Sequence, residues 1–506
     1  MEINFNQIIE IASWIFLAYG LIICAGYIFS AIFSLIELRD YKRAHNFKDE
    51  LALLQSSHLP KISVLAPAYN EEANVIENVR SLLTLDYPFF EIVVINDGSA
   101  DGTLQRLIAN FDLYQDEMVH YTHIRTQKVR GVYSSKNTAY KNLKVIDKVN
   151  GGKADALNTG INCCSHDIIC CIDVDCILER DALLKLIKPF LNNTKKVIAS
   201  GGIIRVANSC TIEDGRIIEV RLPDTFIARA QILEYFRAFL MGRMAWSRVD
   251  GLLLISGAFG MFDKKIVIEA GGYDHNTVGE DMELLVRMRR MMRERKIPYT
   301  VGFVPDPLCW TEVPQSWKVL HRQRNRWTRG TVETLTLHRK MLFNPKYGVL
   351  GILSTPYWMF FEWFAPIIEF FGVLFFIFLM FFGHVNWMVF AIFFGVIYSF
   401  SILFSITALF FEEFSFQQYK KPRYLIRLLG TALLEPIIYH PFVMWAAVKG
   451  NIDLIRGKKS WGKMTRTGLS NPTKKKSNVD SQLPQSKAAE YNTKKTTNIS
   501  TQTSEH

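Results

Sequence analysis

The sequence predicts an α/β domain with a doubly wound sheet, inserted between membrane-spanning helices. Short apolar runs at 62–66, 91–95 and 167–172 have the length of buried strands, and helical patterns follow them, for example at 72–83 and 180–191. Alternation of strand and helix is typical of a largely parallel sheet covered by helices on both faces. Two stretches of 26 residues, 11–36 and 386–411, contain no Asp, Glu, Lys or Arg and are long enough to cross a bilayer.

Charge and composition divide the chain into four segments. The first uncharged stretch is preceded by acidic residues alone and followed by Arg39, Lys42, Arg43 and Lys48. Basic residues favour the cytosolic side, so this asymmetry puts the N-terminus outside. We expect an N-terminal transmembrane helix (1–37), a cytosolic α/β domain (38–345), a membrane region with interfacial and transmembrane helices (346–450), and a basic, largely disordered cytosolic tail (451–506).

The second membrane region is expected to contain a hairpin of two spans, 366–383 and 386–411. Residues 347–365 carry a proline and a glutamate, which predicts an interfacial or bent entry. Residues 424–448 make a poor simple span because of their charges and prolines, which are Arg427, Glu435, Pro436, His440 and Pro441. We expect this segment to lie at the interface or to re-enter, so that an even number of crossings leaves the tail in the cytosol.

Composition argues against a nucleic-acid partner and against a zinc site. The formal net charge is +11, but residues 449–506 hold 12 Lys and Arg against 4 Asp and Glu, a net +8. Such a tail suits the anionic inner leaflet of a lipid bilayer. Five of the eight cysteines lie within 163–176 without a C-x-x-C pair, which indicates packing residues. The segment 125–148 carries seven Lys and Arg and is expected to be a solvated insertion.

Polar clusters follow the first two predicted strands. Tyr69 and Glu71 lie after the strand at 62–66, and Asp97 lies in the Asn-Asp-Gly-Ser sequence after the strand at 91–95. Ligands of doubly wound sheets bind at the carboxyl ends of strands, where a carboxylate can accept hydrogen bonds from a nucleobase or ribose. An Asx-type turn explains the same residues without a ligand.

Two further clusters carry charge that suits a diphosphate. Lys153 lies in Gly-Gly-Lys-Ala-Asp-Ala-Leu-Asn, a glycine turn that begins a helix. Asp173 and Asp175 follow the strand at 167–172, and paired carboxylates at this spacing can hold a hard cation such as Mg²⁺ or Mn²⁺. A solvated turn is the alternative for the Asp-x-Asp sequence. Among the motifs, neither a P-loop nor G-x-G-x-x-G occurs, which argues against ATPase and dinucleotide-binding functions.

The last two clusters precede the second membrane region. Glu280 and Asp281 open a helical run, where they could act as a general base or simply as favourable charges at a helix start. Gln323, Arg326 and Trp327 belong to a Gln-x-x-Arg-Trp sequence. Arginine can bind phosphate oxygens and tryptophan can stack on a sugar ring, although an interfacial tryptophan with basic neighbours is the ordinary alternative.

These motifs, taken in order, resemble the processive family 2 glycosyltransferases, which include cellulose, chitin, hyaluronan and poly-β-1,6-N-acetylglucosamine synthases. The resemblance covers about residues 60–330, and Gln-x-x-Arg-Trp after Glu-Asp is its most specific part. The stretch 461–464 after the membrane region also resembles bacterial poly-N-acetylglucosamine synthases. The resemblance implies a GT-A fold, a UDP-sugar donor and an inverting displacement.

The resemblance also implies roles for individual residues. Base catalysis falls to Asp281, with Glu280 beside it, and acceptor binding to Trp327. A metal ion, Mg²⁺ or Mn²⁺, is expected at Asp175 and Asp173. Nucleotide-sugar binding is expected at Tyr69, Glu71, Asp97, Lys153, Asp173, Gln323 and Arg326.

Two positions depart from the family pattern. Asn96 stands where many members have a second aspartate, which weakens the case for base recognition at Asp97. Gly279 precedes Glu280-Asp281 where cellulose synthases usually have threonine, which argues against a cellulose product.

The leading hypothesis is a multi-pass enzyme of the bacterial inner membrane that extends a polysaccharide from UDP-N-acetylglucosamine in the cytosol. We expect a UDP-sugar, a polysaccharide acceptor, the lipid bilayer and accessory export proteins as its partners. A non-processive transferase that adds one sugar to a lipid acceptor is the alternative enzyme. A catalytically inactive membrane subunit is a third class, against which the complete set of acidic residues argues.

Overall fold

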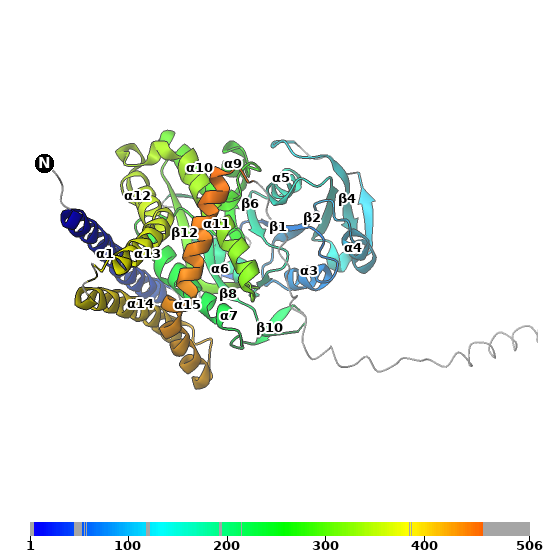
Figure 1. The fold of residues 1–506 in the computed structure, drawn as a ribbon. Coiled ribbons are helices and arrows are strands. Elements are labelled where there is room, and N and C mark those ends of the chain that lie inside the picture. Colours follow the sequence, from blue (N-terminus) through cyan, green and yellow to red (C-terminus); the bar gives the residue numbers. More distant parts are fainter. Residues whose placement is uncertain are drawn as a thin grey trace, which may run out of the picture. The chain divides into compact units, whose positions relative to one another are not determined.

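A mixed sheet organises the α/β domain (Figure 1). The computed structural model describes residues 5–458 except 45–52, 55, 57, 118–121, 192–194, 214, 384 and 386. In this part of the chain the main sheet has ten strands. Their order is β3 (Leu113–Asp116), β4 (Val129–Ser135), β5 (Leu143–Lys148), β2 (Phe90–Asn96), β1 (Ile62–Ala68), β6 (Ile168–Ile172), β11 (Phe259–Asp263), β8 (Lys196–Val206), β12 (Tyr299–Thr311) and β7 (Ile177–Leu178).

The three strands predicted from apolar runs form the parallel centre of this sheet. β1 pairs in parallel with β2 on one side and β6 on the other, and β2 pairs in parallel with β5. All are buried along most of their length. The sheet is mixed rather than purely parallel, because β4 and β11 run antiparallel to their neighbours. A small hairpin of β9 (Thr211–Glu213) and β10 (Arg216–Glu219) lies outside the main sheet.

The prediction of a solvated insertion at 125–148 was wrong. This segment contributes β4 and β5, and β5 is a buried strand next to β2. Of the seven basic residues, four lie outside the two strands. Within the strands, Arg130 is exposed and Lys144 is partly exposed, while Val145 packs into the core. Lys148 is the exception, since it is fully buried between two carboxylates.

Helices cover both faces of the sheet (Figure 1). The helices predicted after the first and third strands begin two or three residues late, as α3 (Val75–Leu83) and α6 (Ala182–Leu191). The other helices of the domain are α4 (Thr103–Phe111), α5 (Lys153–Cys163), α7 (Phe226–Tyr235), a π-helix (Phe236–Arg243), α8 (Met244–Arg248), α9 (Lys264–Glu269), α10 (Glu280–Glu294) and α11 (Trp317–Leu337).

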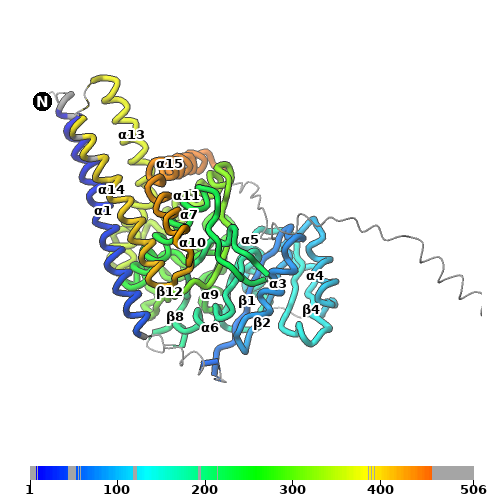
Figure 2. Tube along the Cα trace, turned by 90° about the horizontal axis from the view of Figure 1, so that it is seen from below, coloured from blue at the N-terminus to red at the C-terminus, as the bar shows by residue number. Residues whose placement is uncertain are grey.

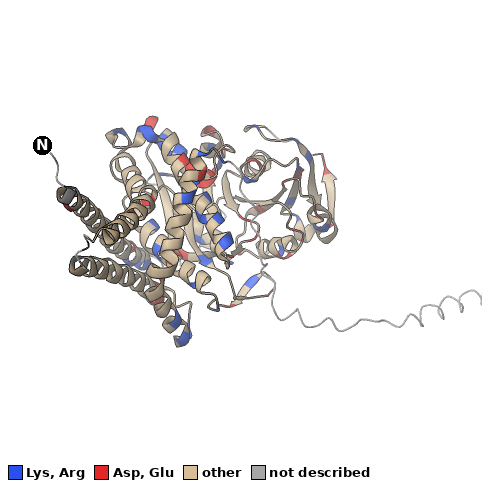
Figure 3. Cartoon of the chain, in the orientation of Figure 1, with Lys and Arg blue, Asp and Glu red and all other residues tan. Residues whose placement is uncertain are grey.

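Within the described residues, four helical segments are long and apolar enough to cross a membrane: 9–43, 350–381, 390–415 and 422–455. They correspond to α1 (Phe5–Ala44), to α13 (Ala365–Phe381) with the helical pieces before it, to α14 (Trp387–Ser415) and to α15 (Pro422–Ile455). α1 and α14 lie side by side (Figure 2), and the Tyr27 and Phe404 rings stack with centroids 4.5 Å apart. α13 and α14 carry few charged residues (Figure 3).

The segment before α13 is a chain of short helical pieces, as its proline suggested. A π-helix (Leu350–Ser354), α12 (Thr355–Tyr357) and a second π-helix (Trp358–Trp363) lead into α13. Residues 424–448 differ from the expected broken segment, because they lie in the single continuous helix α15 despite two internal prolines. Of the tail expected at 451–506, residues 459–506 lie outside the described residues.

Both ends of α15 contact the α/β domain. At its start Lys421 Nζ lies 2.7 Å from Glu219 Oε1, and near its end Asn325 Nδ2 donates to Asp453 Oδ2 at 3.0 Å. Gly450 packs so closely on α11 that a Cβ there would lie 2.9 Å from the Asn325 carbonyl oxygen. The helix therefore runs along the domain, and both of its ends are fixed to it.

A buried ion pair joins the sheet to α14. Arg205, at the end of β8, pairs with Glu412, and both side chains are almost completely buried. The Arg205 guanidinium also lies 5.0 Å from the ring centroid of Phe236 and 5.4 Å from that of Phe416. A buried guanidinium depends on its partner, because a lone charge in a low-dielectric interior is strongly disfavoured.

Glu412→Gln should therefore destabilise the fold, because it leaves Arg205 buried without a counter-charge. We expect a loss of about 3–5 kcal/mol. Thermal unfolding of the purified protein in detergent measures the effect. Glu413→Gln, an identical change at the partly exposed next position, is the matched control and should change stability by less than about 0.5 kcal/mol. Equal unfolding temperatures for the two variants would contradict a stabilising role of the pair.

Candidate functional site

Two polar loops meet at the carboxyl ends of β1 and β2. Ala68 and Asn96 are partners in the strand register, so the loops that follow start side by side. Asn70 Oδ1 accepts a hydrogen bond from Ala100 N at 2.8 Å, and Glu71 N donates to Thr103 Oγ1 at 3.0 Å. These bonds link the two loops and hold Tyr69, which is 53% exposed, at the sheet edge.

Asp97 is directed inward and builds the glycine turn before α5. Its carboxylate accepts from Gly151 N at 3.0 Å, from Gly152 N at 2.8 Å and from Lys148 Nζ at 2.6 Å. Gly152 has φ of +85°, a conformation that favours glycine. In this structure Asp97 fixes the turn that carries Lys153, while its direct contact with a nucleobase remains a prediction.

Lys148 is the residue of this region that the sequence analysis missed. Its ammonium group lies 2.6 Å from Asp97 and 2.7 Å from Asp155, and it donates to the Val149 carbonyl at 2.7 Å. All three of its donors are therefore used. The available signal was a lysine that ends an apolar strand and directly precedes the glycine turn, but its charge had been counted as solvated.

A cluster of charges forms where α5, β6 and α10 meet. Lys153 Nζ lies 2.5 Å from Asp173 Oδ1 and 3.8 Å from Glu280 Oε1. Burial alone would lower the pKa of Lys153, but Asp173 and Glu280 outweigh it and the net shift is upward. Burial raises the pKa of Glu280, Lys153 opposes this, and the charge of Asp281 adds to it. Lys153 therefore stays cationic among three acids.

The Asp-x-Asp sequence provides a candidate cation site. Oxygens of Asp173 and Asp175 and the sulfur of Cys176 all lie within 4.8 Å of one another. Carboxylate oxygens are suitable ligands for Mg²⁺ or Mn²⁺, whereas a thiol favours softer metals. The two aspartates thus fit a hard divalent cation that leaves coordination positions open for a ligand.

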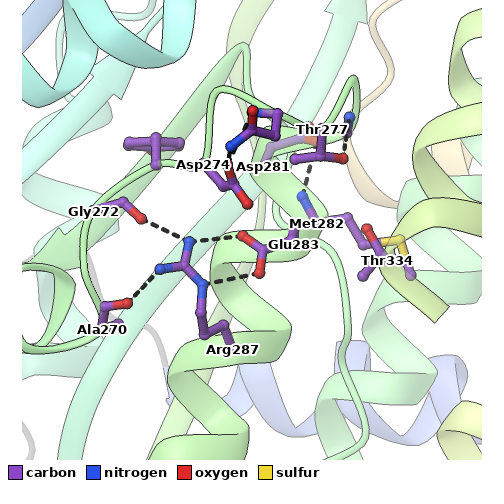
Figure 4. A network of polar contacts seen from close by, with 12 residues as sticks. Ala270, Gly272, Asp274, Thr277, Asp281, Met282, Glu283, Arg287 and Thr334 are labelled. Carbon is purple, nitrogen blue, oxygen red and sulfur yellow. Dashed lines mark hydrogen bonds and ion pairs between the residues drawn. The ribbon is translucent and has the colours of Figure 1, made fainter. Parts of the chain in front are cut away.

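Asp281 is held by backbone donors at the start of α10 (Figure 4). Its Oδ2 accepts from Gly257 N at 2.8 Å and its Oδ1 from Met282 N at 2.8 Å. In the same first turn, Glu283 binds Arg287, which also donates to the carbonyl oxygens of Ala270 and Gly272. This network fixes the loop before α10, so the orientation of Asp281 is set by the fold.

The start of α10 is also locked to α11. A Cβ on Gly279 would lie 2.7 Å from the Cα of Gly330, and one on Gly330 would lie 2.7 Å from the Cα of Gly279. Glu333 of α11 accepts from Val278 N and from Thr277 Oγ1, both at 2.9 Å. Gly279, noted as a departure from cellulose synthases, is required here because any side chain would separate the two helices.

α11 presents the Gln-x-x-Arg-Trp residues to the same region. Trp327 is 40% exposed, and the Arg324 guanidinium lies 4.0 Å from the centroid of its ring system. Arg324 donates to Gln323 Oε1 at 2.7 Å and to Glu234 Oε2 at 2.5 Å. Arg324, which the motif leaves unspecified, thus orients both Gln323 and Trp327.

One cavity of about 810 Å³ joins most of these residues. The predicted site residues that line it are Lys153, Asp173, Glu280, Asp281, Gln323, Arg326 and Trp327. Tyr69, Glu71, Asp97 and Asp175 are outside this lining. The cavity continues between the apolar helices, where its lining includes Tyr27, Tyr357, Trp358, Glu362, Trp363, Glu369, Phe404 and His440. The charged cluster and the membrane region therefore share one space.

Comparison with known proteins places this geometry among glycosyltransferases. Residues 60–330 match the family model "Glycosyltransferase like family 2". The chain is 29% identical over 290 residues to a poly-beta-1,6-N-acetyl-D-glucosamine synthase of Staphylococcus epidermidis, covering 57% of this chain and 59% of the relative. It is 28% identical over 319 residues to the probable glycosyltransferase YdaM of Bacillus subtilis, covering 62% and 64%. The chain thus spans less than two thirds of these relatives.

A solved structure with an overall likeness is the mannosyltransferase PcManGT from Pyrobaculum calidifontis in complex with GDP-Man and Mn²⁺. The TM-score is 0.47 at 16% identity, covering 87% of this chain and 99% of that chain.

Lys148→Met should destabilise the protein and weaken donor binding, because Asp97 and Asp155 then lie buried without their cation. We expect a loss of about 3–5 kcal/mol in unfolding free energy. Thermal unfolding and calorimetric titration with UDP measure the two effects. Arg130→Met is the control, since that side chain is 51% exposed and 3.8 Å from Asp147, and it should have little effect. Unchanged stability of the Lys148 variant would contradict this role.

Proposed function

We propose that this chain, which belongs to glycosyltransferase family 2, extends a polysaccharide at a membrane. The chain is a glycosyltransferase with a GT-A type fold. The proposed donor is UDP-N-acetylglucosamine, as the names of the Staphylococcus relatives suggest. The observation that carries the proposal is the cavity that connects the acidic cluster with the apolar helices. A product that grows at the cluster would have a path toward the membrane.

The donor diphosphate is proposed to bind at the cationic side of the cavity. Lys153 lies beside Asp173, and Arg326 lines the same space. A guanidinium can bind two phosphate oxygens at once, and an ammonium group adds a point charge. A divalent cation held by Asp173 and Asp175 would neutralise negative charge on the departing nucleotide. Tyr69 at the neighbouring strand end offers an exposed ring face for the base.

Asp281 is the proposed general base. Inversion requires an acceptor hydroxyl that attacks from the face opposite the departing nucleotide, with its proton passing to a carboxylate. Asp281 lines the cavity and is oriented by Gly257 N and Met282 N. Glu280 is more buried and is engaged by Lys153, so it suits an electrostatic role. Asp173 would be occupied by the cation.

The acceptor chain is proposed to stack on Trp327 and to leave between the helices. Trp327 lines the cavity, and its ring is steadied by Arg324. Aromatic rings continue this surface toward α13, among them Trp358 and Trp363. The C–H faces of sugar rings pack on aromatic side chains, so such a lining suits a polysaccharide.

The catalytic domain and the tail are proposed to be cytosolic in the bacterial inner membrane. α1, the 350–381 segment and α14 have the length and composition of spans. α15 also has this length, but both of its ends contact the α/β domain, which supports a helix that returns to the same side. Export proteins that receive the chain outside are part of this proposal.

The product of purified protein in lipid vesicles tests the proposed function. A panel of UDP-sugars is supplied, and the products are sized and sequenced by mass spectrometry. We expect long N-acetylglucosamine chains from UDP-N-acetylglucosamine. A lipid that carries a single added sugar would identify the non-processive alternative. A protein that binds UDP but releases no UDP from any UDP-sugar would be an inactive subunit.

Asp281→Asn should retain UDP binding and lose transfer by about 10²-fold or more, because the amide cannot accept the hydroxyl proton. Initial rates of UDP release with saturating donor and acceptor measure this. Asp274→Asn, the same change in the neighbouring loop, should stay close to wild type. If Asp281→Asn transfers sugar at a near wild-type rate while Glu280→Gln is inactive, then Glu280 is the general base and Asp281 is not.

Trp327→Ala should impair elongation more than donor hydrolysis, since it removes the acceptor surface and leaves the diphosphate site. We expect a difference of roughly 10-fold or more between the two activities. Product length and UDP release, measured on the same samples, separate them. An equal loss of both activities would indicate that Trp327 has only a structural role at the membrane edge.

Excess chelator should abolish transfer, and Mg²⁺ or Mn²⁺ should restore it. Asp175→Asn should raise the metal concentration needed for half-maximal activity by roughly 10-fold or more, because a ligand is lost. Asp181→Asn, whose carboxylate pairs with Lys185 on the nearby helix, serves as the control. Full turnover in chelator would exclude a metal at this site.

A further inference from the structure

A groove with an apolar floor and a basic rim lies between α1 and α14. Its lining residues are Leu35, Leu38, Arg39, Lys42, Arg43, Phe410, Phe411, Phe414 and Ser415. The catalytic cavity has none of these residues in its lining. We propose that this groove binds one anionic phospholipid, with an acyl chain on the apolar floor and the phosphate at the basic rim. The inference rests on the proposed membrane insertion of α1 and α14.

The groove is a fixed feature of the helix pair. Tyr27 of α1 stacks on Phe404 of α14, with ring centroids 4.5 Å apart. About four turns further along α1 and three along α14, Lys42 Nζ donates to the Phe414 carbonyl at 3.1 Å. The helices are thus joined at two levels. Leu35, which lies between these levels, is 49% exposed, and the Phe414 side chain, at the second level, is 78% exposed.

The polarity of the groove changes along its length in the order that a phospholipid requires. Leu35, Arg39 and Lys42 follow one another at spacings of four and three residues, so they share one face of α1. This face is apolar in the direction of the membrane and basic toward the cytosolic end predicted by the positive-inside rule. A phospholipid has the same arrangement, with its apolar acyl chain toward the membrane interior and its anionic phosphate toward the cytosolic surface.

Nearby acidic side chains are engaged elsewhere. Glu37 and Asp40 are outside the groove lining, and each has an oxygen 2.9 Å from Arg248 Nη1. Glu412 is buried in its pair with Arg205. Among the described residues that line the groove, none is acidic, and Glu413 of the adjoining turn is outside the lining. The rim therefore carries three cations, which select an anionic headgroup.

Native mass spectrometry of the full-length protein in detergent tests the site. The probes are dioleoyl phosphatidylglycerol and dioleoyl phosphatidylcholine, added in increasing amounts. The wild-type protein should bind one molecule of phosphatidylglycerol at least roughly 10-fold more tightly than one molecule of phosphatidylcholine. Arg39→Gln/Arg43→Gln should lower this affinity by roughly 5-fold per cation removed, and Arg39→Lys/Arg43→Lys should retain most of it. Phe414→Ala should lower the affinity for both lipids, because it removes part of the apolar floor.

The matched control is Lys420→Gln/Arg423→Gln, which removes two exposed cations that are outside the groove lining. It should leave phosphatidylglycerol binding within about 2-fold of wild type. An equal loss in both double variants would indicate a diffuse basic surface and overturn the proposal, as would the absence of lipid preference in wild type. Sugar transfer is measured in a separate experiment. A protein that transfers no sugar would contradict the proposed function, whereas only the lipid-binding measurement decides whether the groove binds an anionic phospholipid.

Discussion

The close crossing of α10 and α11 is the constraint on which the site depends. At Gly279 and Gly330 the two backbones approach so closely that neither position admits a Cβ. Glu333 adds hydrogen bonds from α11 to the loop before α10. α10 begins with the proposed base and α11 carries Trp327, so this contact fixes the distance between the group that would activate an acceptor and the ring that would hold it. Separation of the helices would disturb both at once.

Buried cations organise the rest of the domain in the same way. Lys148 holds two carboxylates under the glycine turn, and Arg205 joins the sheet to α14. Burial of a charge requires a partner of opposite sign, so each cation specifies one arrangement of its surroundings. Lys153 differs because it lines the cavity, and its contacts with Asp173 and Glu280 could be exchanged for contacts with a diphosphate. The first two cations stabilise the fold, while the third faces the cavity in which we propose that the donor binds.

The apolar runs predicted the parallel centre of the sheet, and the resemblance to family 2 glycosyltransferases grouped Lys153, Asp173, Glu280 and Asp281, which line one cavity in the structure. The sequence could not predict Lys148, since a lysine looks solvated until the two carboxylates are placed beside it. The strands within 125–148 were missed for the same reason, because a segment with seven basic residues looks solvated although its apolar residues pack into the sheet. The crossing at Gly279 and Gly330 joins residues 51 positions apart, a contact that no local pattern reveals.

Under our proposal, a neutral sugar chain would pass through the part of the cavity that lies between the apolar helices. Arg237 is bound to Glu435, with Nη1 2.7 Å from Oε2, and His440 Nε2 lies 2.8 Å from Glu369 Oε2. These four polar side chains are therefore engaged with one another in pairs, and Glu362 lines the same space. Tyr357 and Trp358 line the same space and offer ring faces at several depths. Many weak contacts of similar strength would let a chain slide, whereas one strong subsite would retain it. Under our proposal, tight binding belongs at the donor and acceptor subsites, and the path between the helices stays permissive.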